Sequence, residues 1–258
     1  MNPWQFLKLL RRRNSQQIVK RLVDLAFSRL QGGNYSEARQ LLLRALEYKS
    51  EIQNPVLLEW ILASLSKTWE ETEEYEKWTK FFSDFIAQNP NQAVAYQLRA
   101  ESHWYGGSLS DAVADYSRAL EFNPKDVSAF LGRGQVFMEC RDFSRALEDL
   151  DAALGSIDSV PGADAVWKAE FEAFARSGRA ATYAGLGDFG RALEEFRKSI
   201  DLCPENAWVY YNRAEAFQNH GDRKNAVENY KLALAKKSPK LTSPKRAHAE
   251  TVLNALER

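Results

Sequence analysis

Cysteine is scarce in this sequence, with only Cys140 and Cys203 among 258 residues. Two thiols cannot build the disulfide framework that stabilises small secreted proteins, so a reducing compartment is expected. Long apolar runs are also missing: "LLEWILASL" (57–65) is among the longest, whereas a membrane-spanning helix needs about 20 residues. The opening "MNPWQFLKLLRRR" has its charge after the apolar run and no small-residue cleavage site, so it matches a secretory signal poorly. We expect a cytoplasmic location; an Arg-rich, acid-free start also fits an organelle transit peptide.

Neither charge is in excess, because 35 Lys and Arg balance 35 Asp and Glu. Dedicated nucleic-acid-binding proteins normally show a basic excess, so this balance argues against nucleic acid as the partner. The balance hides an asymmetry: residues 1–23 carry +6, residues 236–258 carry +4, and the middle carries −10. The basic ends leave a membrane-surface adaptor open as an alternative function. The apolar residues of "WQFLKLLRRR" spread widely around a helical wheel, however, which favours packing onto the protein over membrane contact.

Catalytic and metal-binding motifs are missing as well. The three histidines and two cysteines have no metal-ligand spacing. "GLGDFG" (185–190) matches the letters of a dinucleotide-binding loop, but such a loop must follow a strand, and this one follows a helical pattern. Nothing resembles a nucleophile elbow, a P-loop or the kinase motifs. We therefore expect no enzymatic activity, no cofactor, no metal ion and no small-molecule substrate.

One phrase recurs along the sequence at fixed spacing. "FSDFIAQNP" (82–90), "YSRALEFNP" (116–124) and "FRKSIDLCP" (196–204) each run from an aromatic residue through an aliphatic residue to proline. The aromatic residues of the first two copies are 34 residues apart, and so are Phe196 and Tyr230. A period of 34 residues is typical of stacked helical hairpins.

Turn signals divide each period into two helices. "GGS" (106–108), "GLGD" (185–188) and "HGD" (220–222) place glycine between the paired helices, where left-handed backbone is favourable only for glycine. Proline after the second helix of most copies stops that helix. Before the second copy, Asn54-Pro55 predicts a helix start, with Asn as the N-cap and Pro as the first helical residue.

These copies closely resemble the tetratricopeptide repeat, whose pattern is W-x2-L-G-x2-Y, then A-x3-F, then P. The copy from Ala93 carries the pattern at Tyr96, Arg99, Ala100, His103, Ala112, Tyr116, Ala119 and Pro124. The resemblance implies an all-α protein, a right-handed solenoid of about six helix-turn-helix repeats with N- and C-terminal helices. We divide the sequence into a basic N-terminal helix (1–18), two degenerate repeats (19–92), four well-marked repeats (93–240, with a 12-residue insertion near 161–172) and a C-terminal capping helix (241–258).

Two places depart from the family's pattern. Trp78 and Phe85 stand where the family prefers alanine, so the second hairpin must be splayed or shifted in phase. At the insertion, the sequence predicts one long helix from about Ala163 to Leu186. Three aromatic residues share one stripe of this helix: Trp167, Phe171 and Phe174. This part of the helix either packs on the fourth hairpin or forms a wall beside the groove. We expect packing, because exposed aromatic stripes promote aggregation.

The resemblance also implies where a partner binds. In this family the first helix of each repeat lines a concave groove, and fixed positions point into it. Carried onto this sequence, those positions include these candidate peptide-binding residues: Gln97, Glu101, Trp104, Tyr105, Leu131, Gln135, Met138, Glu139, Phe174, Trp208, Tyr211 and Glu215. The fifth copy offers mostly small residues there, which should leave a recess between Met138 and Trp208.

The groove positions predict the chemistry of the partner. Aromatic rings supply much apolar contact area at low entropy cost, and the glutamates attract basic residues. We therefore expect a non-catalytic protein–protein interaction module, scaffold or adaptor that binds an apolar peptide or helix with basic residues. At the C-terminus, we expect Val252, Leu253 and Leu256 to cover the last repeat.

Overall fold

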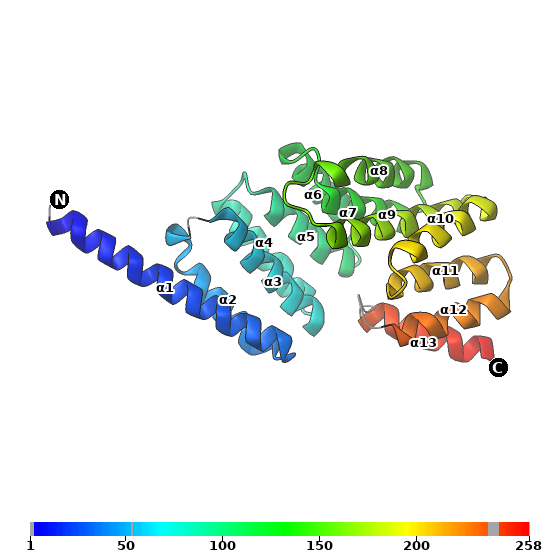
Figure 1. Cartoon of the computed structure of the whole chain (residues 1–258), viewed down its shortest axis with the longest axis horizontal. Helices are drawn as coiled ribbons and strands as arrows, with labels where there is room; N and C mark the ends of the chain where they lie inside the picture. Colours follow the sequence, from blue (N-terminus) through cyan, green and yellow to red (C-terminus); the bar gives the residue numbers. More distant parts are fainter. Residues whose placement is uncertain (1–2, 53, 237–242, 258) are drawn as a thin grey trace. The chain divides into compact units, whose positions relative to one another are not determined.

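The computed structural model describes residues 3–52, 54–236 and 243–257, with side chains at 14–50, 52, 54–236 and 245–256. Within these residues all regular structure is helical, and none belongs to a strand. The helices follow one another in pairs joined by short turns (Figure 1). The predicted all-α repeat fold is therefore confirmed.

Two compact units divide the chain, residues 1–108 and 109–258. Unit 1 contains α1 (Pro3–Gln31), α2 (Tyr35–Leu46), the short 3-10 helix η1 (Lys49–Glu51), α3 (Pro55–Thr72), α4 (Tyr75–Gln88) and α5 (Ala93–Tyr105). Unit 2 contains α6 (Leu109–Phe122), α7 (Val127–Glu139), α8 (Phe143–Ser156), η2 (Ile157–Ser159), α9 (Ala165–Gly185), α10 (Phe189–Leu202), α11 (Ala207–Asn219), α12 (Arg223–Ala235) and α13 (Ser243–Glu257). The boundary falls in the turn between α5 and α6, inside the segment 93–240 that the sequence pattern groups together.

Helix α1 runs from Pro3 to Gln31, so the boundary placed at residue 18 from the sequence lies inside it. No proline or glycine stands between Pro3 and Gly32 to interrupt the helix. Its C-terminal half packs against α2. The buried residues of this hairpin are Val19, Leu22, Ala26, Ala38, Leu42 and Ala45.

The second hairpin starts as predicted and is splayed. Asn54 caps α3 by accepting a hydrogen bond from the backbone N–H of Val56 at 3.0 Å, and Pro55 opens the helix. Trp69 of α3 meets Phe81 and Phe82 of α4 with ring centroids 5.0 and 6.3 Å apart. These large rings separate the two backbones, whereas the buried Trp78 meets the Tyr105 ring of α5 at 6.0 Å. Helix α4 accordingly packs more extensively on α5 than on its own hairpin partner.

The long helix predicted at the insertion is α9, which has 21 residues. Asp164 caps it by accepting a hydrogen bond from the backbone N–H of Trp167 at 2.7 Å. Trp167 and Phe171 stack with centroids 4.0 Å apart, and both pack on the core formed by Leu131, Leu150 and Ile157. The stripe therefore covers the fourth hairpin, as expected.

Glycine occupies the left-handed position in most of the hairpin turns. Gly187 and Gly221 have φ of +83° and +85°, and nothing lies within 4 Å of the Cβ that another residue would add. Backbone conformation, and not space, therefore selects glycine there. The turn between α7 and α8 instead places Arg141 at φ +58°, although the sequence offers no glycine to signal it.

A row of arginines, which we call the arginine ladder, joins the hairpins of unit 2. Arg133, Arg179 and Arg213, on first helices, each face the residue sixteen positions later on the second helix: Asp149, Glu195 and Asn229. The Arg133 guanidinium donates to both carboxylate oxygens of Asp149, at 2.8 and 2.7 Å. The ladder also reaches back to the preceding hairpin, because Arg133 donates to the Ser117 hydroxyl at 2.9 Å and Arg179 lies 3.2 Å from Asp151.

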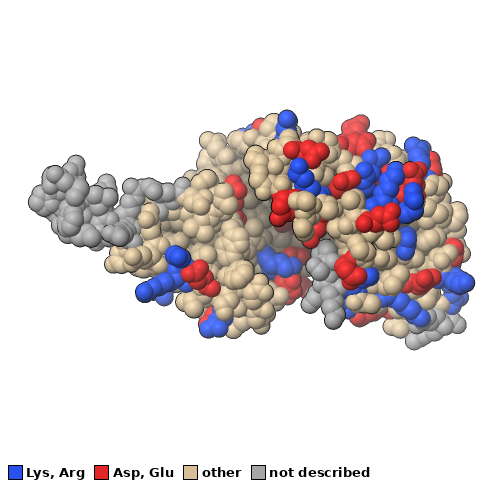
Figure 2. Space-filling model, in the orientation of Figure 1, with Lys and Arg blue, Asp and Glu red and all other residues tan. Residues whose placement is uncertain are grey.

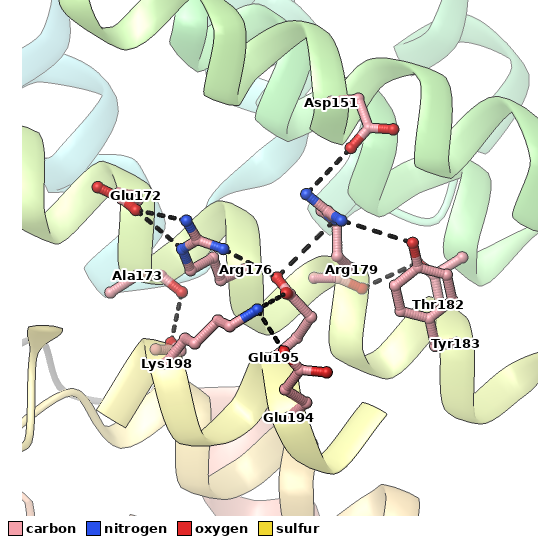
Figure 3. A network of polar contacts seen from close by, with 12 residues as sticks. Asp151, Glu172, Ala173, Arg176, Arg179, Thr182, Tyr183, Glu194, Glu195 and Lys198 are labelled. Carbon is pink, nitrogen blue, oxygen red and sulfur yellow. Dashed lines mark hydrogen bonds and ion pairs between the residues drawn. The ribbon is translucent and has the colours of Figure 1, made fainter. Parts of the chain in front are cut away.

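Around Arg179 the ladder widens into a network of charges between α9 and α10 (Figure 3). The buried Glu195 accepts hydrogen bonds from Arg176 at 3.2 Å and from Lys198 at 3.1 Å. Arg176 in turn donates to Glu172 at 2.8 Å. Each charge drawn in this network faces an opposite charge, so the network holds α9 on α10 and offers no free charge for chemistry.

Acid should weaken unit 1 through one carboxylate. Glu74, just before α4, accepts hydrogen bonds from Lys77 at 2.6 Å and from Arg39 of α2. These bonds lower the pKa of Glu74 from 4.5 to about 2. Because the pKa of Glu74 is lower in the folded protein, its stabilisation is present above pH 4.5 and is lost as the pH falls toward 2.

We therefore expect Glu74→Gln to lower the melting temperature at neutral pH, with the difference from the wild type vanishing near pH 2. Thermal unfolding followed by circular dichroism across this range measures the effect. Glu76→Gln, on an exposed part of α4, is the matched control. If Glu74→Gln lowered the melting temperature by the same amount at every pH, the charge of Glu74 would not contribute to stability.

Candidate functional site

The candidate residues of unit 2 lie on its first helices. In α7, α9 and α11 they are Leu131, Gln135, Met138, Glu139, Phe174, Trp208, Tyr211 and Glu215. Helix α9 contacts both α7 and α11, so these three helices form one surface. The ring of Phe174 meets that of Trp208 edge-on, with centroids 6.3 Å apart. We call this surface the first-helix face of unit 2.

Accessibility separates the candidates on this face. Glu139 is exposed, and Met138, Phe174, Trp208 and Glu215 are partly exposed. Leu131 and Tyr211 are only 4% and 1% exposed. Leu131 therefore lies in the core between α7, α8 and α9, and Tyr211 lies under α13. Direct contact of either residue with a partner stays a prediction.

The recess expected at the fifth copy is partly filled. Ser177 of α9 is fully buried and accepts a hydrogen bond from the side-chain amide of Asn212 at 3.0 Å. Next to it, a Cβ on Gly178 would lie 3.0 Å from Nε2 of Gln135 and 2.9 Å from Leu150. The small residues of α9 thus allow neighbouring helices to approach closely, and Gln135 is part of that packing.

Helix α13 covers the α11 side of the face. The Lys245 ammonium lies 5.3 Å from the centroid of the Tyr211 ring and 3.8 Å from Oε1 of Glu139. One turn later, Nε2 of His248 lies 3.7 Å from Oε1 of Glu215. The predicted acidic and aromatic residues therefore already face basic side chains of the same chain.

Apolar contacts hold the rest of α13. Ala249 is fully buried in a core that contains Tyr210, Tyr211 and Tyr230. Val252, Leu253 and Leu256 pack against the same core, which confirms that they cover the last repeat. In Figure 1, α13 lies alongside α12.

Tyr211 links this core to the charged contacts. Its hydroxyl donates to Oε1 of Glu215 at 2.9 Å. Burial raises the pKa of Tyr211 strongly, and the Glu215 carboxylate raises it further. The hydroxyl therefore stays protonated, and it positions Glu215 between Tyr211 and His248.

Unit 1 holds the remaining candidates on α5. Gln97 donates to the Glu101 carboxylate at 3.2 Å, and Trp104 stacks on Tyr105 with centroids 5.2 Å apart. Tyr105 also stacks on Tyr75, 5.9 Å away. Burial raises the pKa of Tyr105 well above its usual value. These four side chains are half-buried and form an aromatic and acidic surface of their own.

Unit 1 also has a feature that the sequence pattern did not single out. A hollow of about 400 Å³ is lined by Gln16, Val19, Lys20, Val23, Asp24, Ile52, Asn54 and Leu57. Near it in the chain, Phe27 is 51% exposed and Val56 is 68% exposed. The hollow is lined by residues of α1 together with Ile52, Asn54 and Leu57, which are distant in the sequence. The repeat pattern therefore did not reveal it.

The described part of the chain offers few features of other kinds of site. No group of three or more His, Cys, Asp or Glu residues there is arranged to hold a metal ion. None of the described helices has both the length and the apolar character that crossing a membrane requires. On the face drawn in Figure 2, acidic and basic side chains are interspersed over unit 2. The membrane alternative depends on residues 4–13 and 236–246; the side chains of 4–13 and 237–244 lie outside the described residues, whereas Lys236, Lys245 and Arg246 pair with Glu205, Glu139 and Glu250.

Two family models match the chain. The model described as "TPR repeat" matches residues 102–139 and 181–221, and that described as "Tetratricopeptide repeat" matches residues 209–235. The chain is also similar to anaphase-promoting complex subunit 3 of Schizosaccharomyces pombe (strain 972 / ATCC 24843), with 24% identity over 169 residues. That match covers 62% of this chain and 22% of the relative, so the chain spans about a fifth of that protein.

Solved structures show the same fold. A thermophilic TPR protein of Thermus thermophilus superposes with a TM-score of 0.59 and 20% identity, covering 78% of this chain and 99% of that one. The APC/C hetero-tetramer Cut9–Hcn1 gives a TM-score of 0.64 and 16% identity, covering 91% of this chain and 42% of that one. The family models thus identify tetratricopeptide repeats at 102–139 and 181–235, and the solved structures show that the chain has the same helical-repeat fold.

Proposed function

We propose that this protein is a non-catalytic scaffold or assembly adaptor that binds an apolar, basic peptide or helix on the first-helix face of unit 2. Tetratricopeptide repeat proteins in general mediate protein–protein interactions and assembly, and the family is generally non-enzymatic. The S. pombe relative is named as a subunit of a complex. A protein partner is therefore the starting point, and its chemistry is our proposal.

One observation supports a basic and apolar partner. Acidic and aromatic side chains share this face, and the basic residues of α13 already lie against them: Lys245 faces Glu139 and Tyr211, and His248 faces Glu215. A partner with the same charge and apolar anchors fits this arrangement. Trp208 and Phe174 are the partly exposed rings that can receive those anchors.

We also propose a cytoplasmic location. Cys140 and Cys203 are free thiols, which a reducing compartment preserves. Expression of a tagged chain followed by fractionation tests this, and recovery with a membrane or an organelle lumen would count against it.

Binding should depend on one exposed glutamate. A panel of amphipathic peptides that range from acidic to basic is titrated against the full chain, and the tightest binder is carried forward. Glu139→Lys should weaken its binding about tenfold, mainly through slower association, and the effect should shrink as salt rises. Glu148→Lys makes the same exchange at an exposed position on the second helix α8 and should change little.

Trp208→Ala on the same peptide should weaken binding by about 2 kcal/mol, roughly 30-fold, if that ring is an anchor site. A melting curve accompanies each variant, so that loss of fold is not mistaken for loss of binding. Preference for acidic peptides, or equal effects of Glu139→Lys and Glu148→Lys, would contradict the proposed function.

A further inference from the structure

We propose that α13 is an intramolecular ligand of the first-helix face of unit 2, and that the partner is a helix of the same chemistry which takes its place. This inference rests on the proposed function, because it specifies the partner class for that same face. The partner site and the docking site of α13 then overlap, so binding requires α13 to leave.

The side chains of α13 follow the spacing of a helix bound through one face. Its contact residues are Lys245, His248, Ala249, Val252, Leu253 and Leu256. Relative to the first, they stand at positions 0, 3, 4, 7, 8 and 11, which lie on one side of an α-helix. Lys245 and His248 occupy the first turns and the aliphatic residues the last, so one end of α13 makes the polar contacts and the other end the apolar ones.

The charged end of α13 is the end that meets the predicted binding residues. Lys245 approaches Glu139 on α7 as well as Tyr211 on α11, and therefore links two first helices. Glu215 and Tyr211 are themselves joined by a hydrogen bond of 2.9 Å. Lys245 thus meets one carboxylate and one ring, and His248 meets the second carboxylate, Glu215. A helix that only covered apolar surface would not need these polar contacts.

The same contacts are weak enough to exchange. The side chains of Lys245 and Glu139 are 33% and 40% exposed, and those of His248 and Glu215 are 50% and 38% exposed. Ion pairs with this exposure contribute little, typically up to about 1 kcal/mol. Among the described residues of α13, Ala249 alone is fully buried. A competing helix with Lys or Arg at the positions of Lys245 and His248, a small residue at the Ala249 position and larger aliphatic residues beyond it would bind more tightly.

The test is direct competition in the full chain. A fluorescent peptide with the sequence of residues 243–257 is titrated, by anisotropy, against the wild type and two α13 variants. Leu253→Asp places a charge against the apolar core and should release α13, whereas Ala255→Asp places the same charge at an exposed position of the same helix. We expect Leu253→Asp to bind the peptide at least tenfold more tightly than the wild type or Ala255→Asp does.

Two further measurements identify the surface that binds the peptide. Adding Glu139→Lys and Glu215→Lys to Leu253→Asp should abolish the increase in peptide affinity. A peptide with glutamate at the Lys245 position should bind Leu253→Asp more weakly than the original peptide does. If Leu253→Asp loses its helical circular dichroism, Lys245→Glu replaces it. That variant keeps every apolar contact of α13, and we expect it to bind the peptide about threefold more tightly than the wild type.

The outcomes separate this inference from the proposed function. Equal binding to the wild type and to Leu253→Asp, or none to a folded Leu253→Asp, would overturn the role of α13. A basic peptide of the earlier panel could bind the wild type through Glu139 and Trp208 with an affinity that Leu253→Asp does not change. In that case the proposed function stands and this inference fails. If no basic peptide binds any folded variant, both fail.

Discussion

Replacing Gly132 by alanine should destabilise unit 2 by about 3 kcal/mol. A Cβ at this position of α7 would lie 2.3 Å from Cζ and 2.4 Å from the hydroxyl of Tyr116 on α6. Tyr116 is 1% exposed, so its rigid ring cannot swing into solvent to make room. The overpacking therefore exceeds the roughly 1 kcal/mol that alanine gains over glycine within a helix. Urea unfolding followed by far-ultraviolet circular dichroism measures the loss.

Gly155→Ala is the matched control. This glycine lies near the end of α8, and nothing is within 4 Å of the Cβ that alanine would add. We expect an unchanged or slightly higher stability there, by up to about 1 kcal/mol. Adding Tyr116→Leu to Gly132→Ala should recover part of the loss, because leucine lacks the atoms that clash. If Gly132→Ala were as stable as Gly155→Ala, the close approach of α6 and α7 would be disproved.

Removing the Asp149 carboxylate should have an effect of similar size. Asp149→Ala leaves the Arg133 guanidinium without the two oxygens that it holds at 2.7 and 2.8 Å. The Asp149 side chain is only 7% exposed and that of Arg133 is 21% exposed, so water replaces the lost bonds poorly. Breaking a buried ion pair by deleting one partner typically costs about 3–5 kcal/mol. We expect Asp149→Ala to lower the free energy of unfolding in urea by about 3 kcal/mol. This value is at the lower end of that range because Arg133 keeps its hydrogen bond to Ser117.

A double-mutant cycle isolates the pair from the individual residues. Arg133→Met combined with Asp149→Ala should be more stable than the sum of the two single losses predicts, by at least about 1 kcal/mol. Asp158→Asn breaks a surface contact with Lys168, in which the aspartate is 92% exposed, and should change stability by less than about 0.5 kcal/mol. Strict additivity of the Arg133 and Asp149 losses would show that their contact contributes nothing of its own.

The regular parts of the fold were predictable because they depend on short-range chemistry. Asn54-Pro55 specifies a helix start through its own backbone, and Gly187 and Gly221 specify a turn through φ alone. The 34-residue period predicted the positions of most helix pairs, and the helical pattern of the insertion predicted the longer helix α9. The splay of the second hairpin was predictable because large rings stand where the family prefers alanine, and Trp78 indeed packs toward α5.

The candidate site was less predictable, because exposure depends on what packs over a residue. Nothing in the local sequence of α11 distinguishes Tyr211, which α13 covers, from Trp208, which stays partly exposed. The position of α13 on α11 depends on contacts between residues more than thirty positions apart, such as Lys245 and Tyr211. The division between α5 and α6 was likewise not visible, because the repeat pattern runs through it unchanged. The basic character of α13 was the one available signal, since it matched the partner chemistry predicted for the groove.

The arginine ladder changes between α10 and α11. Ser117 and Asp151 occupy equivalent positions 34 residues apart, and each accepts a ladder arginine from the following helix. The residue sixteen positions before Arg213 is Arg197, a cation that cannot accept a hydrogen bond from another arginine. The hydrogen bond or ion pair that a ladder arginine makes to the preceding hairpin thus has no counterpart here, because Arg197 and Arg213 carry the same charge. Other contacts hold the sixth hairpin to the fifth: Asn212 donates to the Ser177 hydroxyl at 3.0 Å, and the rings of Trp208 and Phe217 meet those of Phe174 and Phe189. In an array stabilised by its nearest neighbours, coupling of this last hairpin to the others therefore depends on an amide and on aromatic rings in place of an arginine.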